Sequence, residues 1–401
     1  MTVTAVKALL LVIAVLGVSL SLLVLRHRRK EILLALIVLV LSLAGVEISL
    51  RYIIPVISQH DEMFTYDPDL GWAFVPDKRG TIVSGGEARL FIETNAHGFR
   101  DGPIPPLETD TTRIMVLGDS FVTNVSVEDA DVFTEVMERE LRGASVMNFG
   151  VNGYGQVQQY LLLEKWWDQV EPDRVILVVY IRNDFQDNVF GNWLYPGPVA
   201  VWNEEDATLK IVPPPPPPVS SPVPLLWGWY QDSRFFTLFD RGLRALLDRS
   251  PTVRHQQHEP SAVTPPELYL CRKEISEETR TLYRTMEALL LEISGRLEAQ
   301  GVPYLFVLAP SRVQVDDAVW DSMLEEFGED GQNYQASLPN DRLMRFAGDH
   351  GLPMLDLFPP LHAEVQKGRT LYFPHEEHWT AEGNRVVADL LLTSPMLEDL
   401  R

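Results

Sequence analysis

From Arg113 onward the sequence alternates short apolar runs with longer amphipathic stretches, and this alternation restricts the possible folds more than any other feature. The apolar runs have the length and β-branched content of buried strands, and Arg174–Tyr180 is the most strand-like of them. Strands that alternate with helices predict an α/β fold, in which helices cover both faces of a parallel, doubly wound sheet. The expected strands are 114–117, 145–148, 174–180, 304–308 and 353–357, and the expected helices are about 131–141, 156–169, 278–300 and 381–392.

Two long apolar runs begin the chain, Ala5–Leu25 and Ile32 to about Ile54, and each is long enough to cross a membrane as a helix. The basic cluster 26–30 lies between them, and the positive-inside rule places it in the cytoplasm. We therefore expect a transmembrane helical hairpin over 1–55, with everything after Pro55 outside the cytoplasm. A cleaved signal peptide or a pair of core helices are the alternatives. The first run lacks a convincing cleavage site, and most of its basic residues follow the apolar core.

Two further regions frame the alternating pattern. Residues 56–110 form a small β-rich segment, in which strand Arg89–Thr94 leads into the turn Asn95–Arg100. The domain expected over 111–401 is interrupted at about 190–266 by a segment that contains the proline run Pro213–Pro218. Such a run favours polyproline II and excludes a central strand or a helix. We interpret the interruption as an insertion with a helix at about 235–247, and it is either a surface excursion or a lid.

Charge and cysteine content exclude several functions. The net charge is −22, and the part after the apolar runs has no stripe of Lys and Arg, which argues against nucleic acid as a partner. The single cysteine, Cys271, cannot form an intramolecular disulfide and has no neighbours at metal-ligand spacing. His375 and His378 are three residues apart, whereas the helical zinc motif places its histidines at i and i+4. We expect neither a metal nor a cofactor.

Four polar blocks stand where strands end or where the last helix begins. Gly118-Asp119-Ser120 follows the first strand, and the glycine-rich loop Asn148–Gly155 follows the second. Asn183 follows the third strand, and His375–Trp379 precedes the final helix. Ligands bind at the carboxyl ends of parallel strands, so three of these blocks should meet at one edge of the sheet. Alone, Gly-Asp-Ser is most typical of a helix N-cap, but the ordered set predicts a site.

In this order, the four blocks resemble the SGNH (GDSL-like) hydrolase superfamily over most of the chain from Arg113 to Leu392. The Asn95–Arg100 turn and the two apolar runs resemble its bacterial membrane-bound members, which implies a bacterial inner or plasma membrane. The resemblance implies a flavodoxin-like sheet with Ser120 as nucleophile and His378 as base. It also implies an oxyanion hole made by the N–H groups of Ser120 and Gly153 and by the Asn183 amide. The chemistry requires such partners, because a serine hydroxyl needs a base and a developing oxyanion needs donors placed in advance.

The third member of the triad departs from the family pattern. The family places an aspartate two or three residues before the histidine, where this chain has Glu376 and His375. Glu376 can orient the imidazole, since Ser-His-Glu triads exist. The alternatives are a distinct acid, a dyad completed by a backbone carbonyl, or a Glu376 that serves only as negative charge at the start of a helix.

The resemblance favours a membrane-anchored serine esterase that hydrolyses O-acyl esters through an acyl-serine intermediate. The expected substrate is an acylated small molecule or a cell-envelope glycan, with O-acetyl as the candidate group. One alternative is an O-acyltransferase of a polysaccharide-acetylation system, which would have a membrane acyltransferase as partner. The other is a non-catalytic membrane partner that keeps the fold, and the missing aspartate is the best argument for it.

Overall fold

The computed structural model describes residues 29–52, 63–84, 88–107, 110–191, 196–203, 208–214, 265–374 and 377–401. The chain divides into two compact units. The first comprises Met1–Ser58 with Pro218–Glu259, and the second comprises Gln59–Pro217 with Pro260–Arg401. The second unit contains the sheet and the candidate site.

Helix α2, Arg29–Tyr52, is what the structure describes of the first unit. It contains most of the second apolar run and exposes large apolar side chains at Leu34, Ile37, Val38, Leu41 and Val46. Within the described ranges, no helix combines the length and apolar character that a membrane span requires. The first run, Ala5–Leu25, lies outside the described residues. The predicted transmembrane hairpin stays a prediction.

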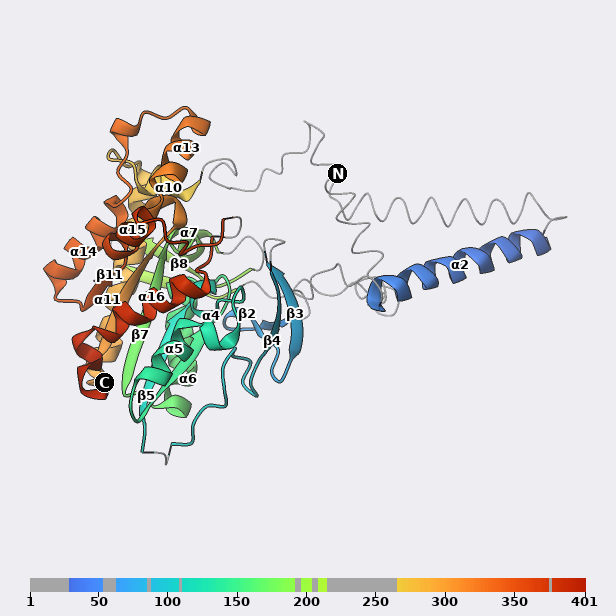
Figure 1. Cartoon of the computed structure of the whole chain (residues 1–401), viewed down its shortest axis with the longest axis horizontal. Coiled ribbons are helices and arrows are strands. Elements are labelled where there is room, and N and C mark those ends of the chain that lie inside the picture. Colours follow the sequence, from blue (N-terminus) through green and yellow to red (C-terminus); the bar gives the residue numbers. More distant parts are fainter. Residues whose placement is uncertain are drawn as a thin grey trace. The chain divides into compact units, whose positions relative to one another are not determined.

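A five-stranded parallel sheet forms the centre of the second unit (Figure 1). Its strands are β5 (Thr112–Gly118), β6 (Ala144–Gly150), β7 (Arg174–Ile181), β10 (Tyr304–Pro310) and β11 (Met354–Asp356). They lie in the order β11-β10-β7-β5-β6. This is the 2-1-3-4-5 order of flavodoxin-like sheets, whose switch point lies between the first and third strands. The predicted α/β fold is confirmed, and the switch point falls between β5 and β7.

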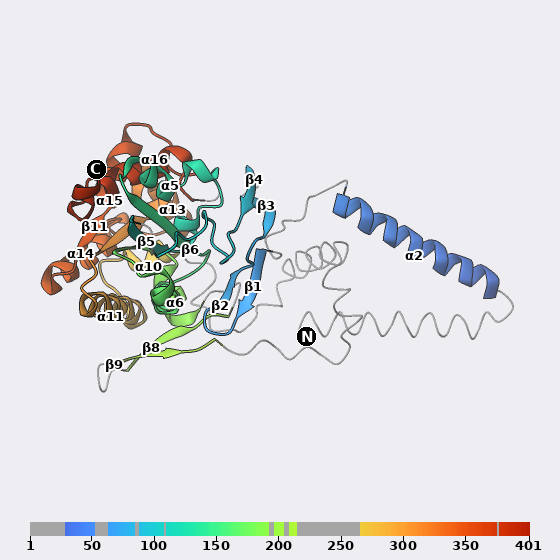
Figure 2. The same cartoon turned by 90° about the horizontal axis from the view of Figure 1, so that it is seen from below.

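Helices cover both faces of this sheet (Figures 1 and 2). Side chains alternate along each strand, so Val175, Leu177 and Val179 of β7 join one core while Ile176 and Val178 join the other. The first core includes α6 (Gln156–Val170), α11 (Glu277–Ala299) and α14 (Leu338–His350), and the second includes α4 (Ser120–Thr123), α5 (Phe133–Glu140), α15 (Phe358–Gln366) and α16 (Ala381–Leu392). The continuous apolar strands of the sequence are therefore buried on both sides.

The β-rich segment before the sheet consists of two antiparallel pairs, which lie beside the α/β part of the unit (Figure 2). The first pair is β1 (Phe64–Asp67) with β2 (Gly71–Phe74), and the second is β3 (Arg79–Ser84) with β4 (Ala88–Glu93). Met63, Trp72, Phe74 and Phe99 are buried in the same core as the sheet. The predicted boundary at 110 stays a prediction, but the segment shares its core with the domain that follows.

Several elements were not predicted. A β-hairpin, β8 (Val199–Asn203) with β9 (Thr208–Val212), occupies part of the predicted insertion. The helix expected at 235–247 lies outside the described residues. The remaining elements are the helices α7 (Asp184–Phe190), α10 (Pro266–Leu270), α12 (Arg312–Val315) and α13 (Asp317–Phe327), and the 3₁₀ turns Asp129–Asp131, Gly331–Asn333 and Pro395–Leu400.

Candidate active site

Ser120 is the first residue of α4, and only Asp119 separates it from the end of strand β5. The Asp119 carboxylate caps this helix by accepting a hydrogen bond of 2.8 Å from the N–H of Phe121. Two glycines at the ends of β5 and β6 leave room for the helix, because a Cβ at Gly150 would lie 2.5 Å from the backbone nitrogen of Thr123. Local sequence and close packing together set the nucleophile at the carboxyl edge of the sheet.

His378 reaches Ser120 across 258 residues of sequence. Its Nε2 lies 2.9 Å from Ser120 Oγ, which is hydrogen-bond distance for proton transfer from a nucleophile to a base. The next residue, Trp379, is fully buried, and its carbonyl accepts a bond of 3.1 Å from the side chain of Asn124. Asn124 is the C-cap of the helix that begins at Ser120. The loop of the base is thus fastened to the helix of the nucleophile.

The two other predicted oxyanion residues lie at the same edge of the sheet. Asn183 follows β7, the neighbour of β5, and its Nδ2 donates a bond of 2.6 Å to Asp187 Oδ2. Gly153 lies in the loop after β6, the other neighbour of β5, with φ of +79°. The structure therefore brings the blocks of Ser120, Gly153, Asn183 and His378 to one edge.

The predicted acid falls outside the part of the chain that the structure describes, since neither His375 nor Glu376 is included. Within the described residues, the buried carboxylate of Asp119 lies next to the nucleophile, and its Oδ2 is 3.4 Å from Ser120 Oγ. Burial raises the pKa of Asp119 to about 6, and hydrogen bonds from Phe121 and Ser120 oppose this shift. The assignment of Glu376 as the triad acid stays a prediction.

An ion-pair cluster beside the site was missed by the sequence reasoning. Arg182, next to Asn183, pairs with Glu377, next to His378. Its Nε also lies 3.1 Å from Oε1 of Glu267, whose side chain is only 1% exposed. Burial raises the pKa of Glu267, and the charge of Arg182 opposes that shift. The adjacency of Arg182 and Glu377 to two motif residues was a usable signal, whereas nothing in the local sequence marks Glu267.

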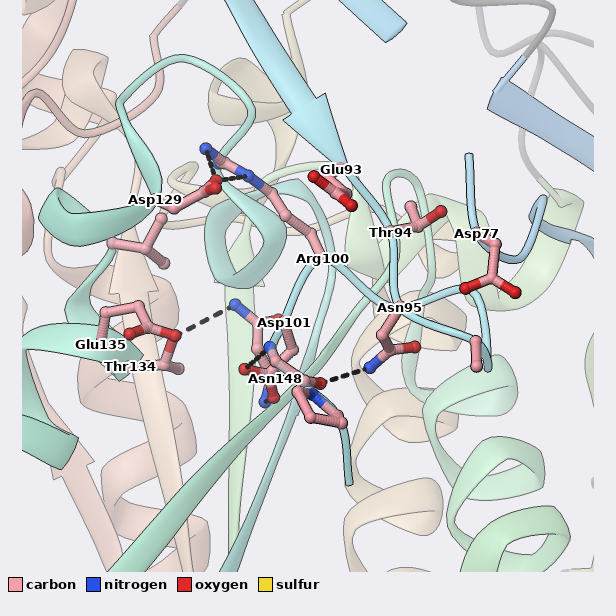
Figure 3. Close-up of a pocket in the computed structure, with 14 residues that line it drawn as sticks. Asp77, Glu93, Thr94, Asn95, Arg100, Asp101, Asp129, Thr134, Glu135 and Asn148 are labelled. Carbon is pink, nitrogen blue, oxygen red and sulfur yellow. Dashed lines mark hydrogen bonds and ion pairs between the residues drawn. The ribbon is translucent and has the colours of Figure 1, made fainter. Parts of the chain in front are cut away.

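Residues of the β-rich segment also contact the site's framework. The buried guanidinium of Arg100 donates to the carbonyls of Thr123 (3.0 Å) and Asn124 at the end of α4 and to that of Val127 (2.6 Å). It also pairs with Asp129 (Figure 3). Burial lowers the pKa of Arg100, and the charge of Asp129 opposes this shift. This part of the predicted turn therefore supports the helix that carries Ser120.

A cavity of about 570 Å³ adjoins this guanidinium (Figure 3). Its lining includes the carboxylates of Asp77, Glu93, Asp101 and Glu135, but neither Ser120 nor His378. Among the described residues, no group of three or more His, Cys, Asp or Glu side chains is arranged to hold a metal ion. The cavity is therefore a feature separate from the Ser120–His378 pair.

The fold and the site define a class of protein. A serine at the start of a helix, after the first strand of a 2-1-3-4-5 sheet and in contact with a histidine, is the arrangement of a serine hydrolase-type enzyme. Residues 268–395 match the family model described as "SGNH hydrolase-like domain, acetyltransferase AlgX". This match confirms the predicted SGNH resemblance, and it covers His378 but not Ser120, Gly153 or Asn183. At a general level, the match supports an enzyme that hydrolyses acyl esters or transfers acyl groups.

Comparison with curated protein sequences finds no match. Among solved structures, a member of the lipolytic G-D-S-L family from Veillonella parvula is 15% identical, with 70% of this chain and 95% of that chain covered and a TM-score of 0.34. The acetyl xylan esterase AlAXEase is 14% identical, with 70% and 98% covered and a TM-score of 0.37. A putative acylhydrolase from Bacteroides fragilis is 10% identical, with 74% and 92% covered and a TM-score of 0.36.

Proposed function

We propose that this protein is a serine esterase that cleaves O-acyl esters through an acyl-serine intermediate. The observation that carries the proposal is the 2.9 Å contact between Ser120 Oγ and His378 Nε2 at the switch point of the sheet. His378 takes the hydroxyl proton as Ser120 Oγ attacks the acyl carbonyl, and the N–H groups of Ser120 and Gly153 with the Asn183 amide stabilise the oxyanion. The alcohol leaves with the proton from His378, and the acyl group remains on Ser120.

The second step decides between hydrolysis and transfer. Water or a second alcohol loses its proton to His378, attacks the acyl-serine and releases Ser120. We favour water as acceptor and an O-acetylated cell-envelope glycan as substrate. The match of residues 268–395 to an acetyltransferase-named family supports a second candidate, an O-acyltransferase that passes the acyl group to a glycan hydroxyl and works with a membrane acyltransferase.

The chemistry is tested with a fluorophosphonate probe, which labels an activated serine covalently. Mass spectrometry of the full chain should locate the adduct on Ser120 and on no other serine. His378→Ala should abolish labelling, because it removes the base that activates the hydroxyl. Release of acetate from p-nitrophenyl acetate, with and without an added glycan acceptor, then separates hydrolysis from transfer. A folded protein that neither reacts with the probe nor hydrolyses the ester would place it in the non-catalytic class.

We further propose that the chain is anchored in a bacterial inner or plasma membrane, with the sheet domain in the periplasm or outside the cell. The support is in the sequence, since the basic cluster 26–30 lies between two apolar runs. Single cysteines test this in a Cys271→Ala background. A membrane-impermeant maleimide applied to intact spheroplasts should label Gln59→Cys and leave Arg28→Cys unlabelled. Labelling of Arg28→Cys alone would reverse the topology, and labelling of both or neither would refute the anchored arrangement.

A further inference from the structure

We propose that Trp72, which lies on β2 in the β-rich segment, is a positioning residue that aims the backbone N–H of Gly153 at the oxyanion. The inference rests on the proposed function, because it assigns Gly153 the role of oxyanion donor. It adds a residue that lies outside the four motif blocks and precedes the sheet domain in sequence.

The loop that contains Gly153 is a tight turn. The N–H of Tyr154 donates to the carbonyl of Val151 at 3.1 Å, which closes a four-residue turn with Asn152 and Gly153 at its centre. Gly153 has a φ of +79°, whereas Asn152 is not among the residues with positive φ. Positive φ at the second central position alone defines a type II turn and explains the glycine there.

The conformation of such a turn can vary mainly in the orientation of its central peptide unit. Types I and II differ in that the peptide between the two central residues is turned over. Here that peptide joins the carbonyl of Asn152 to the N–H of Gly153. Because a peptide unit is planar and trans, its C=O and N–H point in opposite directions, and a group that fixes one fixes the other. Whatever holds the Asn152 carbonyl therefore aims the Gly153 N–H.

Trp72 holds that carbonyl. Its Nε1–H donates to the oxygen of Asn152 at 3.0 Å, across 80 residues of sequence. The indole has little freedom, because Trp72 is 2% exposed and stacks edge to face with Tyr154 at 5.4 Å between ring centres. The hydroxyl of Tyr154 also donates to the carbonyl of Trp72. Hydrogen bonds thus link Trp72 to Asn152 and Tyr154, the residues on either side of Gly153. The N–H of Gly153 points away from the indole.

A purely structural role predicts a different outcome from a positioning role. Loss of a structural hydrogen bond lowers the melting temperature and leaves the turnover of the folded enzyme unchanged. Loss of the aim of an oxyanion donor lowers kcat without changing KM, because the donor stabilises the transition state more than the ground state. It also weakens inhibitors that form a tetrahedral adduct with the serine.

The experiment removes the indole N–H and keeps an aromatic ring at position 72. Trp72→Phe removes the donor, and 3-benzothienylalanine at the same position substitutes sulfur for the N–H in a ring of nearly the same shape. The second variant keeps the test valid if the smaller phenyl ring destabilises the fold. Both should lower kcat for p-nitrophenyl acetate about 10- to 100-fold with KM within twofold, since complete loss of one oxyanion donor costs about 10²- to 10³-fold. Both should raise the inhibition constant of an acyl trifluoromethyl ketone by a similar factor.

Trp202→Phe is the matched control. Trp202 lies on β8, and its indole N–H has no hydrogen-bond partner among the described residues, so its loss should leave kcat unchanged. A benzothienyl variant with the parent's kcat and inhibitor affinity would overturn the inference, and so would a change confined to KM. If the parent itself neither hydrolyses the ester nor reacts with the fluorophosphonate, it is the proposed function that fails.

Discussion

Gly150→Ala tests whether close packing of α4 on the sheet sets the position of Ser120. Gly150 ends β6 opposite Gly118 of β5, beneath the short helix that begins at Ser120. A Cβ at this position would lie 2.5 Å from the backbone nitrogen of Thr123 and 2.7 Å from Cβ of Val122. Real Cβ contacts below 3.0 Å essentially do not occur and ordinary ones begin near 3.4 Å, so the helix must move by about 0.5–0.9 Å. Gly150 is not among the glycines with positive φ, so alanine adds no backbone strain of its own.

The expected result is a large loss of turnover with a modest loss of stability. Ser120 and Thr123 share one turn of helix, so a shift of the turn changes the 2.9 Å contact between Ser120 and His378. A misplacement of about 1 Å in reacting groups costs up to about 10²-fold in rate. Overpacking of a core by one methyl group typically costs about 1–3 kcal/mol, which a domain of this size tolerates.

The assay compares kcat for p-nitrophenyl acetate with the melting temperature of the same samples. Gly348→Ala is the matched control, because Gly348 lies within α14 and a Cβ there meets no atom within 4 Å. Alanine should leave turnover unchanged at this position and stabilise the helix by up to about 1 kcal/mol. A Gly150→Ala enzyme that is folded and turns over at the parent's rate would refute the argument that this contact positions the nucleophile.

Three further predictions address charge and proton transfer. Burial raises the pKa of Asp101 to about 7, so the contribution of this carboxyl to stability is present below about pH 4 and lost as pH rises through 7. Urea unfolding should therefore show that Asp101→Asn removes a pH dependence of the unfolding free energy worth up to roughly 4 kcal/mol. A variant with the parent's pH profile would count against this assignment. Glu376→Ala should lower kcat far less than His378→Ala, and Glu376→Asp should keep substantial activity; parent-like turnover in both Glu376 variants would send the search for the acid elsewhere. Arg182→Gln should lower kcat about tenfold in the parent and by less in a Glu377→Ala background, where Glu267 is the remaining partner of Arg182. Additive losses in this double-mutant cycle would show that Arg182 and Glu377 do not act together.

The sheet and three members of the site could be predicted because their signals are local. Strand β7 is a continuous apolar run, and such runs have few alternatives to a strand buried on both faces. The blocks of Ser120, Gly153 and Asn183 each follow such a strand, so strand order placed them at one edge of the sheet. The family resemblance then paired His378 with Ser120. The contact between their side chains, by contrast, depends on Asn124, which holds the loop of His378 from the far end of α4.

Elements and contacts that depend on distant partners could not be predicted. Helix α13 has an apolar side that packs with Leu268, Val313 and Tyr334 in a small separate core, and its sequence alone does not reveal that partner. The acidic side chain of Glu267 looks like ordinary charge in the first turn of a helix, yet it is buried because Arg182 reaches it. In both cases the deciding interaction joins residues that are far apart in the sequence, where periodicity carries no signal.

The β-rich segment shows how much of a catalytic framework can lie outside its motifs. The sequence separates residues 56–110 from the α/β domain, because its pattern changes near residue 110 from turns and short strands to alternating strands and helices. Packing joins the two, since Arg100 binds the carbonyl groups at the end of the nucleophile's helix and Trp72 binds the turn of Gly153. Both contacts go to backbone carbonyl groups, which the sheet domain would present equally with other side chains at those positions. The sequence of that domain therefore carries no trace of them, and a fragment that begins at 111 would contain every motif residue but lose both supports of the site.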